Sequence, residues 1–306
     1  MTEPNLQVNL AGLVLANPVL PASGTYGYGR EYLPFLNPEI FGAVVTKGVS
    51  LEAWPGNPPP RVFETPSGML NAIGLQNPGV ESFIAEALPF LRQYRVPVIV
   101  NVVGKTIPEY AGVVEQLTGY PEIAGFEVNI SCPNVKEGGI AFGTDPEMAA
   151  AVTGAVRRVT GKPLIVKLSP NVTDITRIAV RVVAAGADCL SLINTLLGMA
   201  IDIRRRRPVL GNTVGGLSGP AIKPVALRMV WQVHQAVSVP LIGMGGIATA
   251  ADALEFIMAG ASAVAIGTGT FHDPTTPVQV KAGIRDFLVE NGIKDLKDLI
   301  GAAHRS

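Results

Sequence analysis

Eight short apolar runs, separated by longer segments with helical spacing, restrict the fold of this 306-residue sequence more than any other feature. The runs are rich in Val, Ile and Leu and hardly alternate with polar residues, as strands buried on both faces require. We expect a parallel sheet covered by helices. The predicted strands are Pro18–Ala22, Ala43–Lys47, Pro97–Val103, Gly125–Ile130, Pro163–Leu168, Asp188–Asn194, Pro240–Met244 and Ala263–Ile266.

Helical patterns occupy seven of the segments between and after these runs. They are Val80–Arg95, Pro108–Gly119, Pro146–Thr160, Thr173–Ala185, Ala221–Ala236, Thr249–Ala259 and Pro277–Glu290. Asp145 before Pro146 is a typical helix start, as is the pair Thr173 and Asp174. Eight strands with helical crossovers predict an α/β fold, a (β/α)8 TIM barrel, with residues 1–306 in a single domain. An N-terminal β-hairpin over Val8–Leu15 is expected to cover the barrel bottom.

Three connections are longer than the roughly 2–6 residues usual for such folds. Each follows the C-terminal end of a strand, where barrel enzymes place their active sites. We interpret these long βα loops as ordered lids over the C-terminal mouth; they are Gly48–Gly79, Ser131–Asp145 and Thr195–Gly219.

Composition argues against several classes of protein. Lys plus Arg and Asp plus Glu number 24 each, so no basic excess points to nucleic acid. The sequence has neither a signal pattern nor a run of about 18 apolar residues, so we expect no membrane segment and a cytoplasmic location. Two cysteines, Cys132 and Cys189, are too few for an iron–sulfur cluster, and the three histidines lack metal-ligand spacing. We therefore expect reduced thiols and no metal site.

Polar residues in or directly after the predicted strands are candidates for ligand binding. Burying an amide or ammonium group costs several kcal/mol unless it is paired. Convergence of such groups at the barrel mouth would suit a ligand with amide-like and anionic groups, although a self-satisfied polar network is the alternative. The residues are Lys47, Asn101, Asn129, Lys167 and Asn194.

Glycine-rich segments follow the last two predicted strands, at Gly243–Ile247 and Gly267–Thr270. In barrels these two loops often bind phosphate through backbone N–H groups, although two tight turns would have the same composition. The sequence contains neither a GxGxxG fingerprint nor a P-loop. A mononucleotide such as FMN therefore fits better than NAD.

Cys132 lies between polar residues in the segment Asn129–Asn134, at the end of the fourth predicted strand. A thiol in such a place can act as a base once its environment favours the thiolate. An inert buried thiol is the alternative, and we expect that state for Cys189.

In order and spacing, these segments resemble the class 1 dihydroorotate dehydrogenases over nearly the whole chain. Class 1 enzymes use a cysteine base, whereas class 2 enzymes use serine and carry an N-terminal membrane helix. Gly198–Ile203 and Leu210–Pro224 resemble the NAD-linked subclass 1B. The segments that carry the class 1 resemblance are Ala22–Thr25, Thr46–Gly48, Asn71–Gly79, Asn129–Asn134, Val166–Leu168, Ile193–Thr195, Gly243–Ile247 and Gly267–Thr268.

The resemblance implies residues for two neighbouring ligands. FMN would be bound by Ser23, Lys47, Gly48, Asn101, Asn129, Lys167, Ile193, Gly219, Gly245, Gly246, Gly267 and Thr268. Substrate would be held by Lys47, Asn71, Ala72, Ile73, Gly74, Leu75, Asn129, Asn194 and Thr195.

The resemblance also implies a reaction, the oxidation of dihydroorotate to orotate in de novo pyrimidine (UMP) biosynthesis. Cys132 would remove the C5 proton while hydride passes from C6 to FMN. Electrons would continue to NAD through a partner subunit with FAD and a [2Fe–2S] cluster, in a heterotetramer of two catalytic and two electron-transfer subunits.

Three alternatives remain at this point. A class 1A enzyme would use fumarate and no partner, and a dihydropyrimidine dehydrogenase-like flavoprotein would share the segment Ser218–Lys223. A catalytically silent barrel could serve as a scaffold. The run Arg204–Arg207 is expected to be a solvated face, or else to touch the partner subunit.

Overall fold

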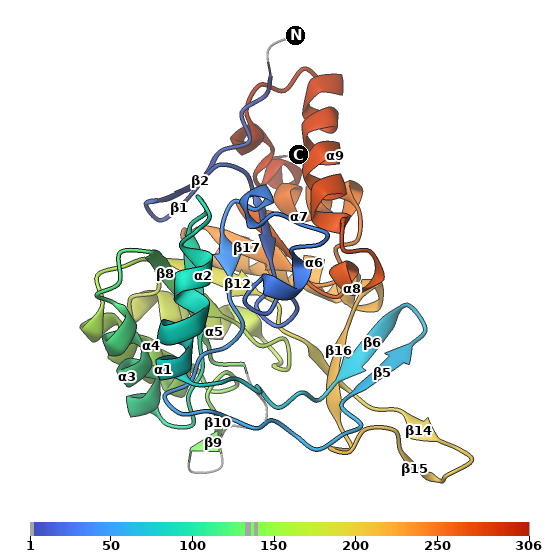
Figure 1. Ribbon diagram of the computed structural model, residues 1–306. Helices are drawn as coiled ribbons and strands as arrows, with labels where there is room; N and C mark the ends of the chain where they lie inside the picture. The colour runs from blue at the N-terminus through green and yellow to red at the C-terminus, as the bar shows by residue number, and fades with distance from the viewer. Residues whose placement is uncertain (1–2, 132–135, 138–139, 306) are drawn as a thin grey trace.

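Eight parallel strands form the centre of the fold in the computed structural model, which describes residues 3–131, 136–137 and 140–305 (Figure 1). Their order in the sheet is β3-β18-β17-β12-β11-β8-β7-β4. The first and last strands of this order meet, because the backbone N–H of Gly42, just before β4, donates to the carbonyl of Val19 in β3 at 2.9 Å. The predicted barrel is confirmed, with strand ends shifted by a few residues at most. The strands are β3 (Val19–Pro21), β4 (Val44–Val45), β7 (Val98–Val102), β8 (Ile123–Asn129), β11 (Leu164–Lys167), β12 (Cys189–Leu192), β17 (Leu241–Met244) and β18 (Ala263–Ile266).

The longer helices α3, α4, α5, α6, α7 and α9 each bury apolar residues in the main hydrophobic core around the barrel. Asp145 and Asp174 accept backbone N–H groups at the starts of α4 and α5, as the sequence predicted. The helices are α1 (Val80–Ser82), α2 (Leu88–Leu91), α3 (Ile107–Leu117), α4 (Pro146–Val159), α5 (Ile175–Ala184), α6 (Lys223–Ala236), α7 (Ala250–Met258), α8 (Gly269–His272) and α9 (Thr276–Glu290). Short 3-10 segments occur at Arg30–Tyr32, Pro38–Ile40, Pro220–Ile222, Leu296–Leu299 and Ala302–Arg305. None of the helices in the described residues is long and apolar enough to span a membrane.

The continuous helix predicted for Val80–Arg95 was wrong in its middle. A π-helical turn, Phe83–Ala87, separates α1 from α2. Pro89 has no N–H to donate to the preceding turn, so the regular hydrogen-bond ladder cannot continue through it.

Two of the three long loops combine into an antiparallel sheet that the sequence did not predict. Strands β5 (Val62–Thr65) and β6 (Gly68–Asn71) come from the loop after β4, and β13 (Leu196–Gly198) and β16 (Gly215–Ser218) from the loop after β12. We call β13, β16, β6 and β5 the loop sheet. The hairpin of β14 (Ile201–Asp202) and β15 (Arg207–Pro208) projects beyond it, as Figure 1 shows at the lower right.

The loop after β8 contains the short pair β9 (Lys136–Glu137) and β10 (Ile140–Ala141), and residues 132–135 and 138–139 lie outside the described residues. The predicted N-terminal hairpin is present as β1 (Val8–Leu10) and β2 (Leu13–Leu15). Leu10 and Leu15 join the main hydrophobic core. Figure 1 shows this hairpin and the loop sheet on opposite sides of the barrel. The loop sheet therefore lies over the mouth of the barrel, away from the N-terminal hairpin.

Candidate active site

A cavity of about 1220 Å³ lies between the carboxyl ends of the barrel strands and the loop sheet. Pockets for one drug-sized ligand measure about 300–1,000 Å³, so this cavity can accommodate two ligands side by side. It brings together all the residues that the family resemblance assigned to FMN or substrate: Ser23, Lys47, Gly48, Asn71, Ala72, Ile73, Gly74, Leu75, Asn101, Asn129, Lys167, Ile193, Asn194, Thr195, Gly219, Gly245, Gly246, Gly267 and Thr268. Cys132, the predicted base, lies outside the described residues.

Lys167 is the buried cation of this cavity. It ends β11, is only 5% exposed, and its Nζ donates to Ser23 Oγ at 3.2 Å. Burial lowers the pKa of Lys167, and the negative charge of Glu127 opposes that shift. A partly desolvated ammonium here can stabilise negative charge on a bound ligand.

Beneath this lysine lies a carboxylate that the sequence prediction missed. Glu127 on β8 is 1% exposed and accepts hydrogen bonds from Asn101 Nδ2 at 2.6 Å and Ser191 Oγ at 2.7 Å. Glu127 interrupts the apolar run of β8, just as the predicted ligand-binding residues interrupt or end other strands, so the same criterion could have identified it.

A hydrogen-bond chain joins the ends of β8 and β12. Asn194 Nδ2 donates to Ser131 Oγ at 2.5 Å, and Ser131 Oγ donates to Asn129 Oδ1 at 2.7 Å. Tyr110 Oη also donates to the Asn129 carbonyl at 2.9 Å. These bonds fix the side chains of Asn129 and Asn194 on the cavity wall. Ser131, which bonds to both of them, directly precedes Cys132 in the sequence.

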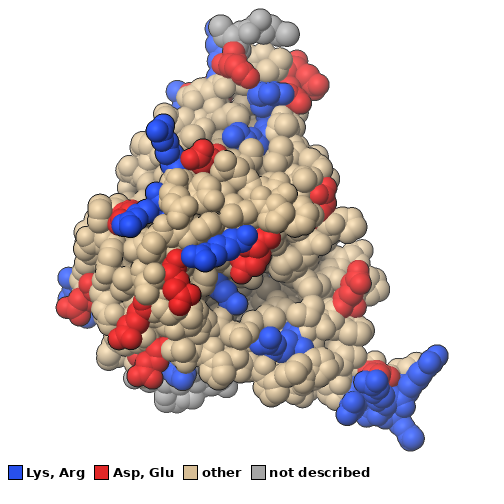
Figure 2. Space-filling view, in the orientation of Figure 1, with Lys and Arg blue, Asp and Glu red and all other residues tan. Residues whose placement is uncertain are grey.

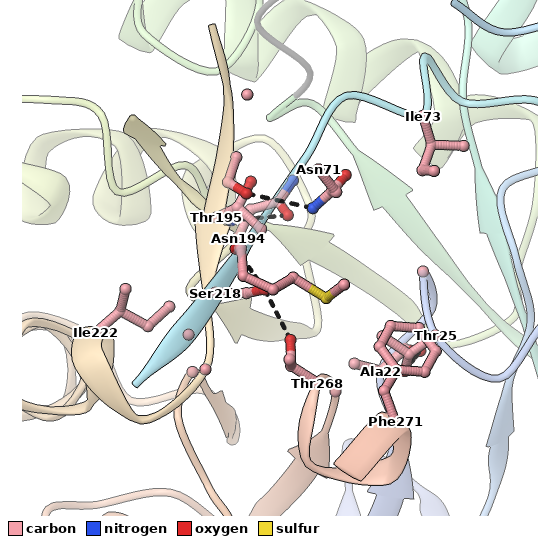
Figure 3. A pocket seen from close by; sticks show the side chains of 18 of the residues that line it. Ala22, Thr25, Asn71, Ile73, Asn194, Thr195, Ser218, Ile222, Thr268 and Phe271 are labelled. Atoms are coloured by element: carbon pink, nitrogen blue, oxygen red, sulfur yellow. Dashed lines mark hydrogen bonds between the residues drawn. The ribbon is translucent and has the colours of Figure 1, made fainter. Parts of the chain in front are cut away.

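The loop sheet supplies the opposite wall. Figure 3 shows Asn71, Asn194 and Thr195 close together in the pocket. Asn71 Nδ2 donates to the Gly216 carbonyl at 3.4 Å across β6 and β16, and Asn194 Oδ1 accepts the Thr195 N–H at 2.9 Å. The substrate residues predicted on two distant loops are therefore neighbours.

Two further cations line the cavity, Lys47 and Arg61. Burial lowers the pKa of Lys47, and Arg61 adds to the shift while Glu31 opposes it. Arg61 also donates to Gln76 Oε1 at 2.8 Å. The sequence prediction missed Arg61, because its place depends on how the loop after β4 folds. Together the two cations favour an anionic group in this part of the cavity.

Glycines form the end of the cavity below β17 and β18. Gly245 and Gly246 have φ values of +123° and +83°, and a Cβ on Gly246 would lie 2.9 Å from the Gly219 carbonyl oxygen. Thr268 Oγ1 donates to Ser218 Oγ at 2.7 Å beside them (Figure 3). Gly243, predicted with this group, does not line the cavity; it packs in β17 against Phe256 of α7.

Comparison with known proteins decides the family. The family model described as dihydroorotate dehydrogenase matches residues 5–288. This chain belongs to the dihydroorotate dehydrogenase family. Within it, a protein of Geotalea daltonii named dihydroorotate dehydrogenase B (NAD(+)), catalytic subunit, is 62% identical over 302 residues, which are 99% of each chain.

Other dihydroorotate dehydrogenases give the same result. Proteins with that same name from Geotalea uraniireducens and Desulforudis audaxviator are 61% and 60% identical, over 99% and 98% of this chain and 99% and 97% of their own. The crystal structure of the Eimeria tenella enzyme in complex with ferulenol superposes with a TM-score of 0.82 at 24% identity, covering 99% of this chain and 90% of that one. That likeness shows the shared barrel fold.

Proposed function

We propose that this chain oxidises dihydroorotate to orotate in de novo pyrimidine biosynthesis, as a flavin-dependent oxidoreductase linked to NAD. The observation that carries the proposal is one cavity, in which the described residues predicted to bind FMN and substrate lie together although they come from ten separate segments of the chain. The relatives named as the NAD(+)-linked B type support this choice over the fumarate-linked and dihydropyrimidine alternatives.

The cavity fits FMN by the chemistry of its donors. Gly245 and Gly246 line the cavity in a turn with positive φ values, and a glycine-rich turn of this kind can bind a phosphate through backbone N–H groups. Asn101 and Lys167 offer polar groups deeper in the cavity, where a flavin ring has carbonyl and N–H edges. We propose residues 1–306 as one FMN-binding barrel domain, with Ser23, Lys47, Gly48, Asn101, Asn129, Lys167, Ile193, Gly219, Gly245, Gly246, Gly267 and Thr268 around the cofactor.

The remaining part of the cavity fits a pyrimidine with a carboxylate. Lys47 supplies a positive charge that can pair with the carboxylate. Side-chain amides match the carbonyl and N–H edges of the pyrimidine ring. The residues proposed to hold the substrate are Lys47, Asn71, Ala72, Ile73, Gly74, Leu75, Asn129, Asn194 and Thr195.

Cys132 is the proposed base that removes the proton from substrate C5. The hydrogen-bonded chain of Ser131, Asn129 and Asn194 fixes the backbone that leads to it. FMN, when bound, supplies a two-electron acceptor for the hydrogen that leaves C6. Lys167 then offsets the negative charge that develops at the cofactor.

The electrons would leave this chain through a second subunit. The relatives are named catalytic subunits, which supports a separate electron-transfer subunit for this chain. We propose that it carries FAD and a [2Fe–2S] cluster and forms a heterotetramer with two catalytic subunits in the cytoplasm.

Replacing the proposed base tests the assignment. Cys132→Ala should retain FMN but reduce the rate of flavin bleaching by dihydroorotate at least about 100-fold, because general base catalysis contributes about 10²–10⁴-fold. Anaerobic stopped-flow absorbance measures this rate. Cys189→Ala is the matched control: this buried thiol on β12 should affect stability and leave the bleaching rate unchanged. Equal rates for wild type and Cys132→Ala would refute the role of Cys132.

A further inference from the structure

Only two charged side chains occur within the eight described barrel strands, and their charges are opposite. Glu127 is on β8 and Lys167 on the adjacent strand β11. Both are buried. An uncompensated charge in such surroundings costs several kcal/mol, so two charges of opposite sign in adjacent strands are expected to depend on one another.

The strand register places Glu127 one layer below Lys167. Lys167 pairs with Asn129 in the parallel ladder, and Glu127 precedes Asn129 by two residues. Alternate residues of a strand point to the same face, so Glu127 lies on the interior face that also presents Asn129 and Lys167. Those two line the cavity and Glu127 does not, so the carboxylate lies beneath the cavity floor.

Hydrogen bonds to Glu127 also determine the orientation of Asn101. Asn101 turns its NH₂ group toward Glu127 and donates to the carboxyl oxygen Oε1 at 2.6 Å. Its Oδ1 then points to Gly48, where an added Cβ would lie 3.3 Å away, on the lining of the cavity. Asn101 thus presents an acceptor to a ligand N–H. Ser191 Oγ fixes the other carboxylate oxygen at 2.7 Å.

We propose that Glu127 is a positioning residue of the cofactor site, which keeps Lys167 protonated and holds the Asn101 oxygen toward the cofactor. The inference rests on the assignment of FMN to this cavity. Glu127 acts through these two residues and does not line the cavity itself.

The groups around Lys167 leave Glu127 as its negative partner in the described part of the chain. Ser23, after β3, accepts its hydrogen bond and is neutral, and Lys47, after β4, is positive. Burial raises the pKa of the Cys189 thiol on β12, which keeps it neutral. Strands β17 and β18 contain no titratable residue. Burial lowers the pKa of Lys167 and Glu127 raises it, so removing the carboxylate should lower that pKa further.

Glu127→Gln tests the electrostatic part through the midpoint potential of bound FMN as a function of pH. Reduction adds negative charge beside Lys167, and a neutral Lys167 takes up a proton in response. The potential therefore falls more steeply with pH once Lys167 is neutral in the oxidised protein. In Glu127→Gln this steeper region should begin about one pH unit or more below its start in wild type. Coincident profiles for the two proteins would overturn the proposal.

Two variants separate charge from packing. Glu127→Asp keeps the charge, so its profile should follow wild type, while its shorter side chain releases Asn101 and weakens FMN binding at least about threefold. Cys189→Ala creates a gap in the same interior without a change in charge, and its profile should also follow wild type. A displacement in Cys189→Ala equal to that in Glu127→Gln would show a packing effect and overturn the electrostatic role.

A further test uses the wild-type protein and therefore does not depend on whether a Glu127 variant folds. The ¹⁵Nζ resonance of Lys167, assigned with Lys167→Gln, should be that of an ammonium group at pH 7.5. A neutral amine at that pH would overturn the proposal. Failure of the wild type to bind FMN would instead contradict the proposed function, so the two failures are distinguishable.

Discussion

At the scale of single residues, the position of a lysine in the barrel decides whether its ammonium group can act on a ligand in the cavity. Lys167 and Lys162 are both lysines with buried contacts, but only Lys167 lines the cavity. Lys162 Nζ donates to the carbonyls of Tyr120 and Ile123, at 2.6 and 2.5 Å. The two lysines therefore offer a direct comparison between a structural and a functional ammonium group.

Lys167→Met should slow flavin bleaching by dihydroorotate at least about 100-fold, because it removes a preorganised positive charge from the place where negative charge develops. Lys162→Met should lower stability and leave the bleaching rate per bound flavin unchanged. Stopped-flow absorbance on both variants, corrected for FMN content, makes the comparison. A similar rate loss in both would mean that Lys167 has only a structural role.

Single residues were predictable where they break an apolar strand pattern. Asn101, Asn129 and Lys167 stand out in this way, because a polar residue in a buried strand needs a partner. Glu127 meets the same criterion and was missed. Arg61 was not predictable, since its place in the cavity depends on the fold of a loop with no strong periodic pattern.

At the scale of elements, the barrel strands were predictable because their apolar runs are local in sequence. The loop sheet was not, since Asn71 of β6 pairs with Gly216 of β16, far along the chain. Nothing in the exposed residues Val62 and Phe63 of β5 marks them as a strand before that partner is known. One wall of the cavity is therefore formed by contacts between distant loops, which local sequence patterns do not predict.

The start of α4 gives a prediction for one element. Asp145 Oδ1 accepts the N–H groups of Glu147 and Met148, each at 2.9 Å. Asp145→Ala should lower the free energy of unfolding by about 1 kcal/mol, as loss of an N-cap does. Urea denaturation followed by circular dichroism measures it. Asp286→Ala, which removes only an exposed pair with Arg285, should change the free energy by less; an equal loss would exclude a capping contribution.

The turn after β17 gives a second prediction at the scale of elements. Gly246→Ala should release FMN and lower the free energy of unfolding by about 1–3 kcal/mol, because its φ is +83° and the new Cβ would meet Lys223 Cβ at 2.8 Å. Gly119→Ala is the control, since no atom lies within 4 Å of the added Cβ. Equilibrium dialysis of FMN compares the two. Full FMN retention by Gly246→Ala would exclude this turn from the cofactor site.

At the scale of the whole molecule, charge is distributed unevenly around a neutral chain. Figure 2 shows a hollow with basic side chains at its edge, and a separate cluster of basic side chains at the tip of the β14–β15 hairpin. The run Arg204–Arg207 is exposed there, as both a solvated face and a contact with a partner subunit would require. The cavity cations Lys47, Arg61 and Lys167 are thus set apart from it, on the face enclosed by the loop sheet.

Anaerobic mixing of the purified FMN-bound protein with dihydroorotate, followed by flavin absorbance, tests the central claim most directly. The account predicts rapid bleaching with one orotate formed per flavin, and much slower bleaching with dihydrouracil, which lacks the carboxylate that Lys47 is proposed to pair with. A protein that binds FMN but does not bleach with dihydroorotate would contradict the proposed reaction. A protein that binds no FMN would contradict the assignment of the cavity.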